Sequence, residues 1–365
     1  MALDLAQPVR AGDGRLMQEV RSQTVRIPAD FEPHARTVMA FAVNREWGGD
    51  RERVERELET VIRTIAEDEP VLLLTPPDRV GPARARGFPA NVEVVPAPVD
   101  DVWMRDIAPV FAHAADGGIV AVDLNFNGWD NSWRRPSRPG DRLARIFDFG
   151  VPVLSVPFVG EGGAFLTDGR GLAIATRSCL LARNRHLAEA DLTAAFGSIG
   201  MRTTIWLHGD RDEPITSGHP DGWIAFAPDG TLLVEPIARG RGRRRRERDI
   251  AVLQRMVANG SISALRRCAP PDADTLAGEP VAFAATYLNF FVTRRSLITA
   301  GLGAADDAAC RDLAALFPGR EIRMLRINAV LRGGGGIRCL TQPVPAPSRR
   351  DGPKGLARPV ELGSP

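Results

Sequence analysis

The sequence has few cysteines and no long apolar run. Its four cysteines, among 365 residues, form no C-x-x-C pair, which argues against a disulfide framework and a structural zinc site. No stretch reaches the roughly 18 apolar residues that a membrane-spanning helix needs. The N-terminal segment MALDLAQPVRAGDGRLMQEV also has no apolar run that would form the core of a secretory signal. We therefore expect a cytoplasmic protein without a membrane partner.

The chain also carries little net charge. Its formal charge is +2, which gives no reason to expect a nucleic-acid partner for the molecule as a whole. A hydrophobic content of 44% and a charged content of 25% are typical of a soluble globular protein with a proper core.

Short apolar runs alternate with amphipathic segments along most of the chain. Strands are predicted at 36–43, 71–75 and 92–98, and a helix is predicted between the first two, ending near Pro70. Later helices are predicted at 141–149, 186–198, 249–258 and 305–316, each followed by a β-like run. This alternation with short connections predicts an α/β fold.

Polar segments flanked by glycine stand where several strands should end. They are DDVWMRDIAP (100–109), GEGGAF (160–165), TSGHPDG (216–222), TYLNFF (286–291) and GGGGIRC (333–339). With Asp106, Glu161, His219, Asn289 and Cys339 as markers, the separations are 55, 58, 70 and 50 residues. Roughly equal spacing indicates repeated modules around an axis, with loops that converge at one end. The five segments are thus predicted to meet in one pocket.

The residue types in these segments favour one kind of chemistry. A lone cysteine is more often a packing residue, but Cys339 shares its loop setting with His219 and several carboxylates. A thiolate nucleophile needs a nearby acid or base, which His219 supplies. The carboxylates of Asp106, Glu161 and Asp221 would repel the oxyanion of peptide hydrolysis, whereas they suit a planar guanidinium cation. The residues therefore favour cysteine chemistry on a guanidine.

The motifs, in their order along the chain, resemble those of the agmatine deiminase and bacterial peptidylarginine deiminase family. The resemblance covers about 30–346 and rests on ADFEPHARTVMAF, DDVWMRDIAPVF, EGG followed by DGRG, DEPITSGHPDG, TYLNFF, FPGR and GGGGIRCLTQPVPA. The chain departs from the usual residues at Ala108, Ser217, Pro220 and Arg338, where the family has glycine, aspartate, an aliphatic residue and histidine. The tryptophan-proline that usually follows the first motif is also missing.

The resemblance implies a fold and a domain plan. The fold would be a five-module α/β propeller of the pentein type, formed as a single catalytic domain at 30–346. Residues 1–29 would be an N-terminal extension, and 347–365 a tail that we expect to be disordered. No metal or organic cofactor is implied.

The resemblance also implies roles for matching residues. Cys339 would be the nucleophile, His219 the general acid and base, and Asp106 and Asp221 the groups that grip the guanidinium. Glu161 would orient the substrate and leaving group. The further substrate-binding residues would be Trp103, Arg105, Trp129, Asn289, Gly335 and Arg338, with Trp133 as an alternative to Trp129. The glycines at 333–336 would leave the approach of Cys339 to substrate open.

Four functions are compatible with this set. The first is hydrolytic deimination of a small guanidino compound, agmatine or an analogue, through a covalent thiouronium. The second is an amidinotransferase, and the third is a deiminase of peptidyl-arginine. The fourth is a non-catalytic binder, which the survival of all five polar residues disfavours. The expected partner is a small-molecule guanidino substrate, and the chain could also form a homodimer.

Two basic features bear on the substrate. Arg338 stands next to the predicted nucleophile, where it would repel the distant amine of agmatine. The run RGRGRRRRER (239–248) has two readings, a solvated loop or a rim that attracts a guanidino compound carrying an anionic group. A role of this run in nucleic-acid binding lacks aromatic interleaving or a known module.

Overall fold

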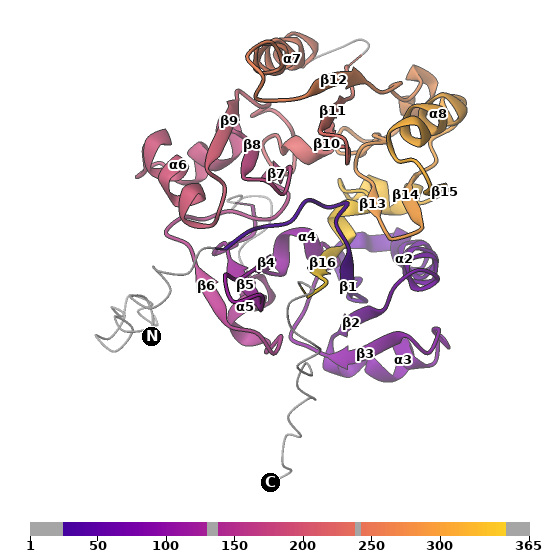
Figure 1. Ribbon diagram of the computed structural model, residues 1–365. Coiled ribbons are helices and arrows are strands. Elements are labelled where there is room, and N and C mark those ends of the chain that lie inside the picture. The colour runs from indigo at the N-terminus through magenta and orange to yellow at the C-terminus, as the bar shows by residue number, and fades with distance from the viewer. Residues whose placement is uncertain (1–24, 130–137, 238–241, 348–365) are drawn as a thin grey trace, which may run out of the picture.

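The computed structural model describes residues 25–129, 138–237 and 242–347. Within these ranges the chain forms five separate sheets of three or four strands. Figure 1 shows the longer helices on the outside of the molecule, with the short helix α4 (Met104–Ile107) near its centre. The predicted α/β class is confirmed.

The first sheet joins the two ends of the described chain. Its strand order is β16 (Gln342–Pro345), β1 (His34–Ala40), β2 (Val71–Thr75) and β3 (Val92–Pro96). β1 runs parallel to β2 and antiparallel to β16, so that His34 lies opposite Pro345. The segment that follows the predicted nucleophile is therefore held by the first strand of the fold.

The other four sheets repeat one pattern, an antiparallel pair followed by a parallel third strand. In chain order they are β4 (Val110–His113), β5 (Ile119–Asp123) and β6 (Val153–Ser155); β7 (Phe165–Thr167), β8 (Leu172–Thr176) and β9 (Thr203–Leu207); β10 (Ile224–Phe226), β11 (Thr231–Val234) and β12 (Ala264–Arg267); and β13 (Phe291–Val292), β14 (Ser296–Ala300) and β15 (Glu321–Leu325).

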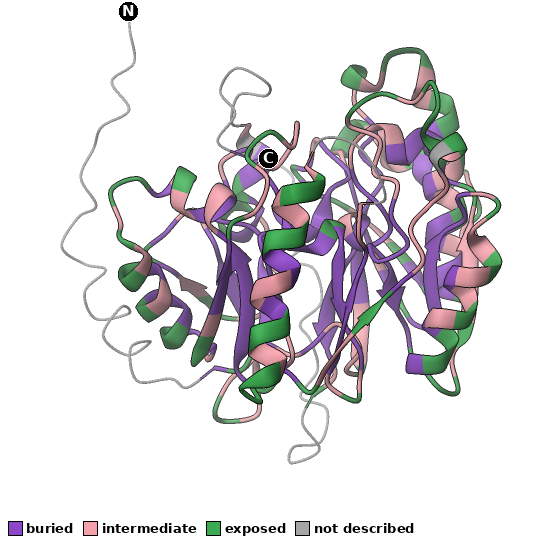
Figure 2. Cartoon of the chain, turned by 90° about the horizontal axis from the view of Figure 1, so that it is seen from above, coloured by how far each residue is buried: buried purple, intermediate pink, exposed green. Residues whose placement is uncertain are grey.

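Helices connect the parallel strands. They are α2 (Arg51–Ala66), α3 (Val80–Arg84), α5 (Leu143–Ile146), α6 (Glu189–Ser198), α7 (Arg243–Ala258) and α8 (Asp306–Leu316). In α2 the residues Val54, Leu58, Val61, Ile62 and Ile65 recur at helical spacing and are all buried. Figure 2 shows the consequence, with buried strands inside and exposed residues on the outer helix faces.

The predicted helices differ in how well their limits were placed. Those at 186–198 and 305–316 are confirmed as α6 and α8. The helix predicted at 141–149 is shorter, a 3₁₀ turn η3 (Pro139–Arg142) followed by the four residues of α5. α7 begins at Arg243, six residues before the predicted start, so the basic run lies partly in a helix rather than wholly in a loop.

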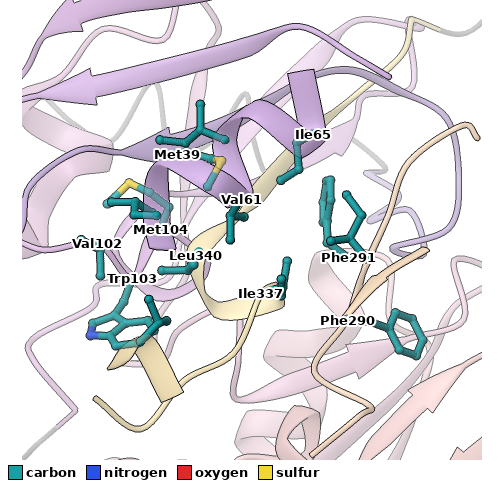
Figure 3. Close-up of a cluster of buried hydrophobic side chains, with 14 of the residues drawn as sticks. Met39, Val61, Ile65, Val102, Trp103, Met104, Phe290, Phe291, Ile337 and Leu340 are labelled. Carbon is teal, nitrogen blue, oxygen red and sulfur yellow. The ribbon is translucent and has the colours of Figure 1, made fainter. Parts of the chain in front are cut away.

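A cluster of buried apolar side chains supports the segment around Cys339 (Figure 3). Ile337 and Leu340, which flank Cys339 within two residues, are both fully buried together with Met39, Val61 and Met104. Burying a side chain of this size contributes roughly 1.5–3 kcal/mol. The core therefore holds the turn η7 (Arg338–Leu340) in place on both sides of the thiol.

The end of the predicted extension packs against the fold. Val25 and Ile27 are buried, and the backbone of Arg26 exchanges two hydrogen bonds of 2.9 Å with that of His113. Residues 1–24 and 348–365, where the rest of the extension and the tail were predicted, lie outside the described residues. Within the described ranges, none of the helices has the length and apolar character needed to cross a membrane.

Candidate active site

A cavity of about 410 Å³ opens where four of the five predicted polar segments meet, while the segment 160–165 contributes no residue to its lining. Its lining includes Trp103, Asp106, Trp129, His219, Asp221, Asn289, Gly335 and Cys339. Glu161, Arg105 and Arg338 do not line it, and Trp133 lies outside the described residues. The volume is within the range of small-molecule sites.

Asp106 lies on the single buried turn α4 at the wall of this cavity. One carboxylate oxygen accepts a hydrogen bond of 2.9 Å from the Gly163 amide, and the other accepts one of 2.8 Å from Trp129 Nε1. Burial raises the pKa of Asp106 to about 6; the charges of Glu161 and Asp221 add to this effect, and His219 opposes it. Trp129 thus orients a carboxylate as well as lining the cavity.

Two glycines allow close contacts around the site. A Cβ on Gly163 would lie 2.6 Å from His219 Nδ1 and 2.7 Å from Asp106 Oδ1. A Cβ on Gly335 would lie 2.4 Å from the Trp103 ring and 2.9 Å from the Cβ of Cys339. The glycines near Cys339 are therefore needed for packing against the surrounding side chains, and not only for the approach of substrate.

His219 lies between two carboxylates. Its Nε2 is 2.5 Å from Glu161 Oε1, and its Nδ1 is 3.7 Å from Asp221 Oδ1. Burial by itself would lower the pKa of His219, but Asp106 and the hydrogen-bonded Cys179 and Glu161 outweigh it and raise the pKa well above its usual range. These groups therefore favour the protonated ring, which has a proton to give.

The two arginines predicted to bind substrate lie behind Asp221 instead. Arg338 donates to Asp221 Oδ2 at 2.7 Å and to Asp30 Oδ2 at 2.6 Å, while Arg105 donates to Asp30 Oδ1 at 3.1 Å. Burial opposes the charge of Arg338, but Asp30 and Asp221 outweigh it and raise the pKa of its guanidinium. The positive charge of Arg338 is therefore neutralised by carboxylates within the protein.

Arg338→Met should lower the free energy of unfolding by about 3–5 kcal/mol, because it leaves the buried Asp221 without its cation. Urea denaturation monitored by circular dichroism measures this loss. Arg323→Met is the matched control, since Arg323 pairs with the more exposed Glu67, and it should cost at most about 1 kcal/mol. Equal losses of unfolding free energy in the two variants would show that the buried position of Arg338 adds nothing to the stability of the protein.

Asn289 links the backbone of Cys339 to that of Asp221. Its Oδ1 accepts a hydrogen bond of 3.2 Å from the Cys339 amide, and its Nδ2 donates at 3.2 Å to the carbonyl of Asp221. Burial raises the pKa of the Cys339 thiol, and the nearby Asp221 and Asp106 raise it further. Burial and these charges therefore favour the neutral thiol in the free protein.

Two residues beside Glu161 were missed as site residues. Cys179 is fully buried with its Sγ 3.7 Å from Glu161 Oε1, and the side chain of Arg183 pairs with Glu161 Oε2. Neither belongs to a glycine-flanked segment, so the pattern that marked the other residues did not mark these. Glu161, Cys179 and His219 have potential metal-ligand atoms within 4.8 Å of one another. The positive charge of Arg183 opposes a cation at this place.

The basic run contributes to the cavity wall through α7. Arg245, which lines the cavity, pairs with Asp210 and with Asp212 Oδ2, the latter at 2.5 Å. Arg246 also lines it, stacks over Trp223 at 4.2 Å and donates to the Glu235 carbonyl at 2.7 Å. The part of the run described by the structure is therefore an ordered helix start, while residues 239–241 lie outside the described ranges.

Comparisons with known proteins agree with one another. The family model of the Porphyromonas-type peptidyl-arginine deiminases matches residues 26–345. A Streptomyces coelicolor protein, provisionally named an agmatine deiminase, is 32% identical over 343 residues that cover 88% of this chain and 99% of that protein. The agmatine deiminase of Ectopseudomonas mendocina is 29% identical, with 90% and 97% of the two chains covered.

The fold agrees with that of solved structures. The agmatine deiminase of Enterococcus faecalis superposes with a TM-score of 0.80 at 24% identity, over 90% of this chain and 97% of that one. On the match of the family model and on the Streptomyces relative, the chain belongs to the Porphyromonas-type peptidyl-arginine deiminase family.

Proposed function

We propose that the chain is a hydrolytic deiminase that converts agmatine or a close analogue to the ureido derivative and ammonia. The observation that carries the proposal is that a thiol, an imidazole and two carboxylates line one cavity, as Cys339, His219, Asp106 and Asp221. Two carboxylates in the same cavity as the thiol suit a planar guanidinium, whose N–H groups match carboxylate oxygens in pairs. The agmatine deiminases among the relatives support the same reaction.

The first half of the reaction would form a thiouronium on Cys339. Burial and the charges of Asp221 and Asp106 raise the thiol pKa; a guanidinium bound between the two carboxylates offsets their charge, so that the thiol gives its proton to solvent and the thiolate forms when substrate is present. The sulfur attacks the guanidinium carbon, and the C–N bond to a terminal nitrogen breaks. Protonated His219 gives its proton to the departing nitrogen, which leaves as ammonia.

The second half would restore the enzyme. Neutral His219 takes a proton from a water molecule, whose oxygen attacks the thiouronium carbon. The C–S bond then breaks, the remaining hydroxyl proton passes to the departing sulfur, and the oxygen stays in the ureido product as its carbonyl, so that the neutral thiol of the free enzyme is restored. The contact of His219 Nε2 with Glu161 holds the ring in one orientation through both halves, as an ion pair in the first and a hydrogen bond in the second.

We also infer that the five sheets are the modules of a propeller. The support is the pairing pattern that four of the sheets repeat and that the first contains in β16, β1 and β2, together with the position of the site residues on the segments that join the sheets. In that arrangement each connection brings one or two polar side chains to a shared axis.

The substrate class is tested by supplying agmatine, free arginine and an arginyl peptide while measuring ammonia and ureido product. Agmatine should react fastest and yield ammonia and ureido product in equal amounts. Transfer of the amidino group to an added amine without ammonia would identify an amidinotransferase. Faster reaction of the arginyl peptide would identify a peptidyl-arginine deiminase.

The value of kcat/KM for a guanidinium substrate should fall as the pH is lowered through about 6. The pKa of Asp106 in the free protein is about 6, and its protonated form offers the cation no charge. A profile of kcat/KM from about pH 5 to pH 8 measures this limb, because kcat/KM reports groups of the free enzyme. If the same limb persists in Asp106→Asn, another group is responsible for it.

A further inference from the structure

The side chain of Arg183 is buried beside His219, and Arg183 does not line the cavity. It follows the π-helical turn η4 (Arg177–Leu181), and its side chain is only 3% exposed. Its Nη1 pairs with Glu161 Oε2, while Glu161 Oε1 lies against His219 Nε2. The two oxygens of one fully buried carboxylate thus join an arginine to the histidine.

The same segment holds the loop that carries His219. Three side chains of this segment donate hydrogen bonds to consecutive backbone carbonyls of the loop. Arg183 Nη2 donates to the Thr216 carbonyl at 3.2 Å. Ser178 Oγ donates to the Ser217 carbonyl at 2.6 Å, and Thr176 Oγ1 donates to the Gly218 carbonyl at 2.7 Å. Ser217 has a φ of 62°, a backbone conformation that needs such support. A π turn, which is frequent at functional sites, lies between Thr176 and Arg183.

We propose that Arg183 is a positioning residue which, through Glu161, fixes the orientation of His219 and sets how firmly that ring holds its proton. This inference rests on the proposed deiminase reaction, in which His219 must both give and take a proton. The pair of Glu161 and protonated His219 carries no net charge, and release of one ring proton leaves a negative charge that the Arg183 guanidinium stabilises. Arg183 therefore makes the proton easier to release.

Other charged and titratable groups surround the pair. Asp106 faces His219 from α4, Asp221 from the turn η5 (Pro220–Gly222), and Cys179 from η4. Arg338 neutralises Asp221 from its far side. All of these remain in an Arg183 variant, so a change in the titration of His219 reports the missing guanidinium.

The test compares Arg183→Gln, Arg183→Lys and the control Arg185→Gln, in which an exposed arginine two residues away is changed. We expect Arg183→Gln to lower kcat by about 10- to 100-fold, as part of the contribution of a positioned acid and base. In the pH profile of kcat, the alkaline limb, where the rate falls as His219 loses its proton, should move upward in this variant by about one pH unit or more. Arg183→Lys should restore the limb but only part of kcat, and Arg185→Gln should match the wild type.

A second measurement does not depend on turnover. The chain has five histidines, so the ring resonance of His219 can be assigned by comparison with His219→Gln and titrated by NMR in each variant. A rise of the His219 pKa in Arg183→Gln, reversed in Arg183→Lys, supports the proposal. If the His219 pKa and the alkaline limb of the kcat profile are both unchanged in Arg183→Gln, the proposal is overturned even if activity falls. A purely structural role of Arg183 would lower activity without moving either of them. Failure of the wild type to release ureido product would instead reject the deiminase reaction.

Discussion

Cys339→Ala is expected to lower the rate of ureido-product formation by several orders of magnitude. The proposed reaction passes through a covalent bond to the Cys339 sulfur, and no other thiol lines the described cavity. Cys179 is close to His219 and Glu161, but it is fully buried behind them and does not reach the cavity. Ammonia release under saturating agmatine measures the loss.

The other cysteines provide controls. Cys310→Ala, on α8, should retain wild-type activity, and Cys179→Ala should retain measurable turnover. Mass spectrometry of acid-quenched wild type should place the thiouronium adduct on the peptide that contains Cys339. Loss of turnover in Cys179→Ala, together with near-normal turnover in Cys339→Ala, would make Cys179 the nucleophile.

Asp106→Asn and Asp221→Asn should each lower kcat/KM by roughly two to four decades. An amide offers the guanidinium one acceptor and no charge, and the loss of a charged buried hydrogen bond typically costs about 2–5 kcal/mol. Steady-state kinetics with agmatine measure the effect. Full activity in either variant, with an unchanged circular dichroism spectrum, would place that residue outside the site.

The two variants should differ in stability. Asp221 pairs with the buried Arg338, so Asp221→Asn should also lower the melting temperature. Asp106 has no arginine partner among the described residues, and its pKa is about 6, above its usual 3.8. A carboxyl with a raised folded-state pKa costs stability once the pH exceeds both values, so Asp106→Asn should melt at the wild-type temperature or higher at pH 8. Its loss of activity therefore cannot be explained by unfolding.

Local pattern determined most of the elements and their order. The strand predicted at 71–75 coincides with β2, and the apolar spacing of α2 buries the predicted face. These features depend on side chains a few residues apart, which the sequence displays directly. The start of α7 was misplaced because a run of arginines looks unfavourable for a helix in isolation. Asp210, Asp212 and Trp223, which come from other segments, provide the compensating contacts.

The residues that line the cavity could be predicted for a related reason. Glycine-flanked polar segments mark places where a fold uses its loops for chemistry, and the family resemblance implied which residues act there; eight of the eleven predicted site residues line the same cavity. Which partner each side chain meets depends instead on contacts between distant segments. Asp30 with Arg338 and Glu161 with Arg183 are pairs of this kind.

Arg338 illustrates what only the tertiary structure decided. By sequence it is next to Cys339 and was expected to face the substrate. In the fold both residues belong to the 3₁₀ turn η7, where successive side chains point about 120° apart. Cys339 lines the cavity, and the side chain of Arg338 turns toward the carboxylates of Asp30 and Asp221. The sequence determined which charges are present, and the packing of the turn against the core determined which side each of them faces.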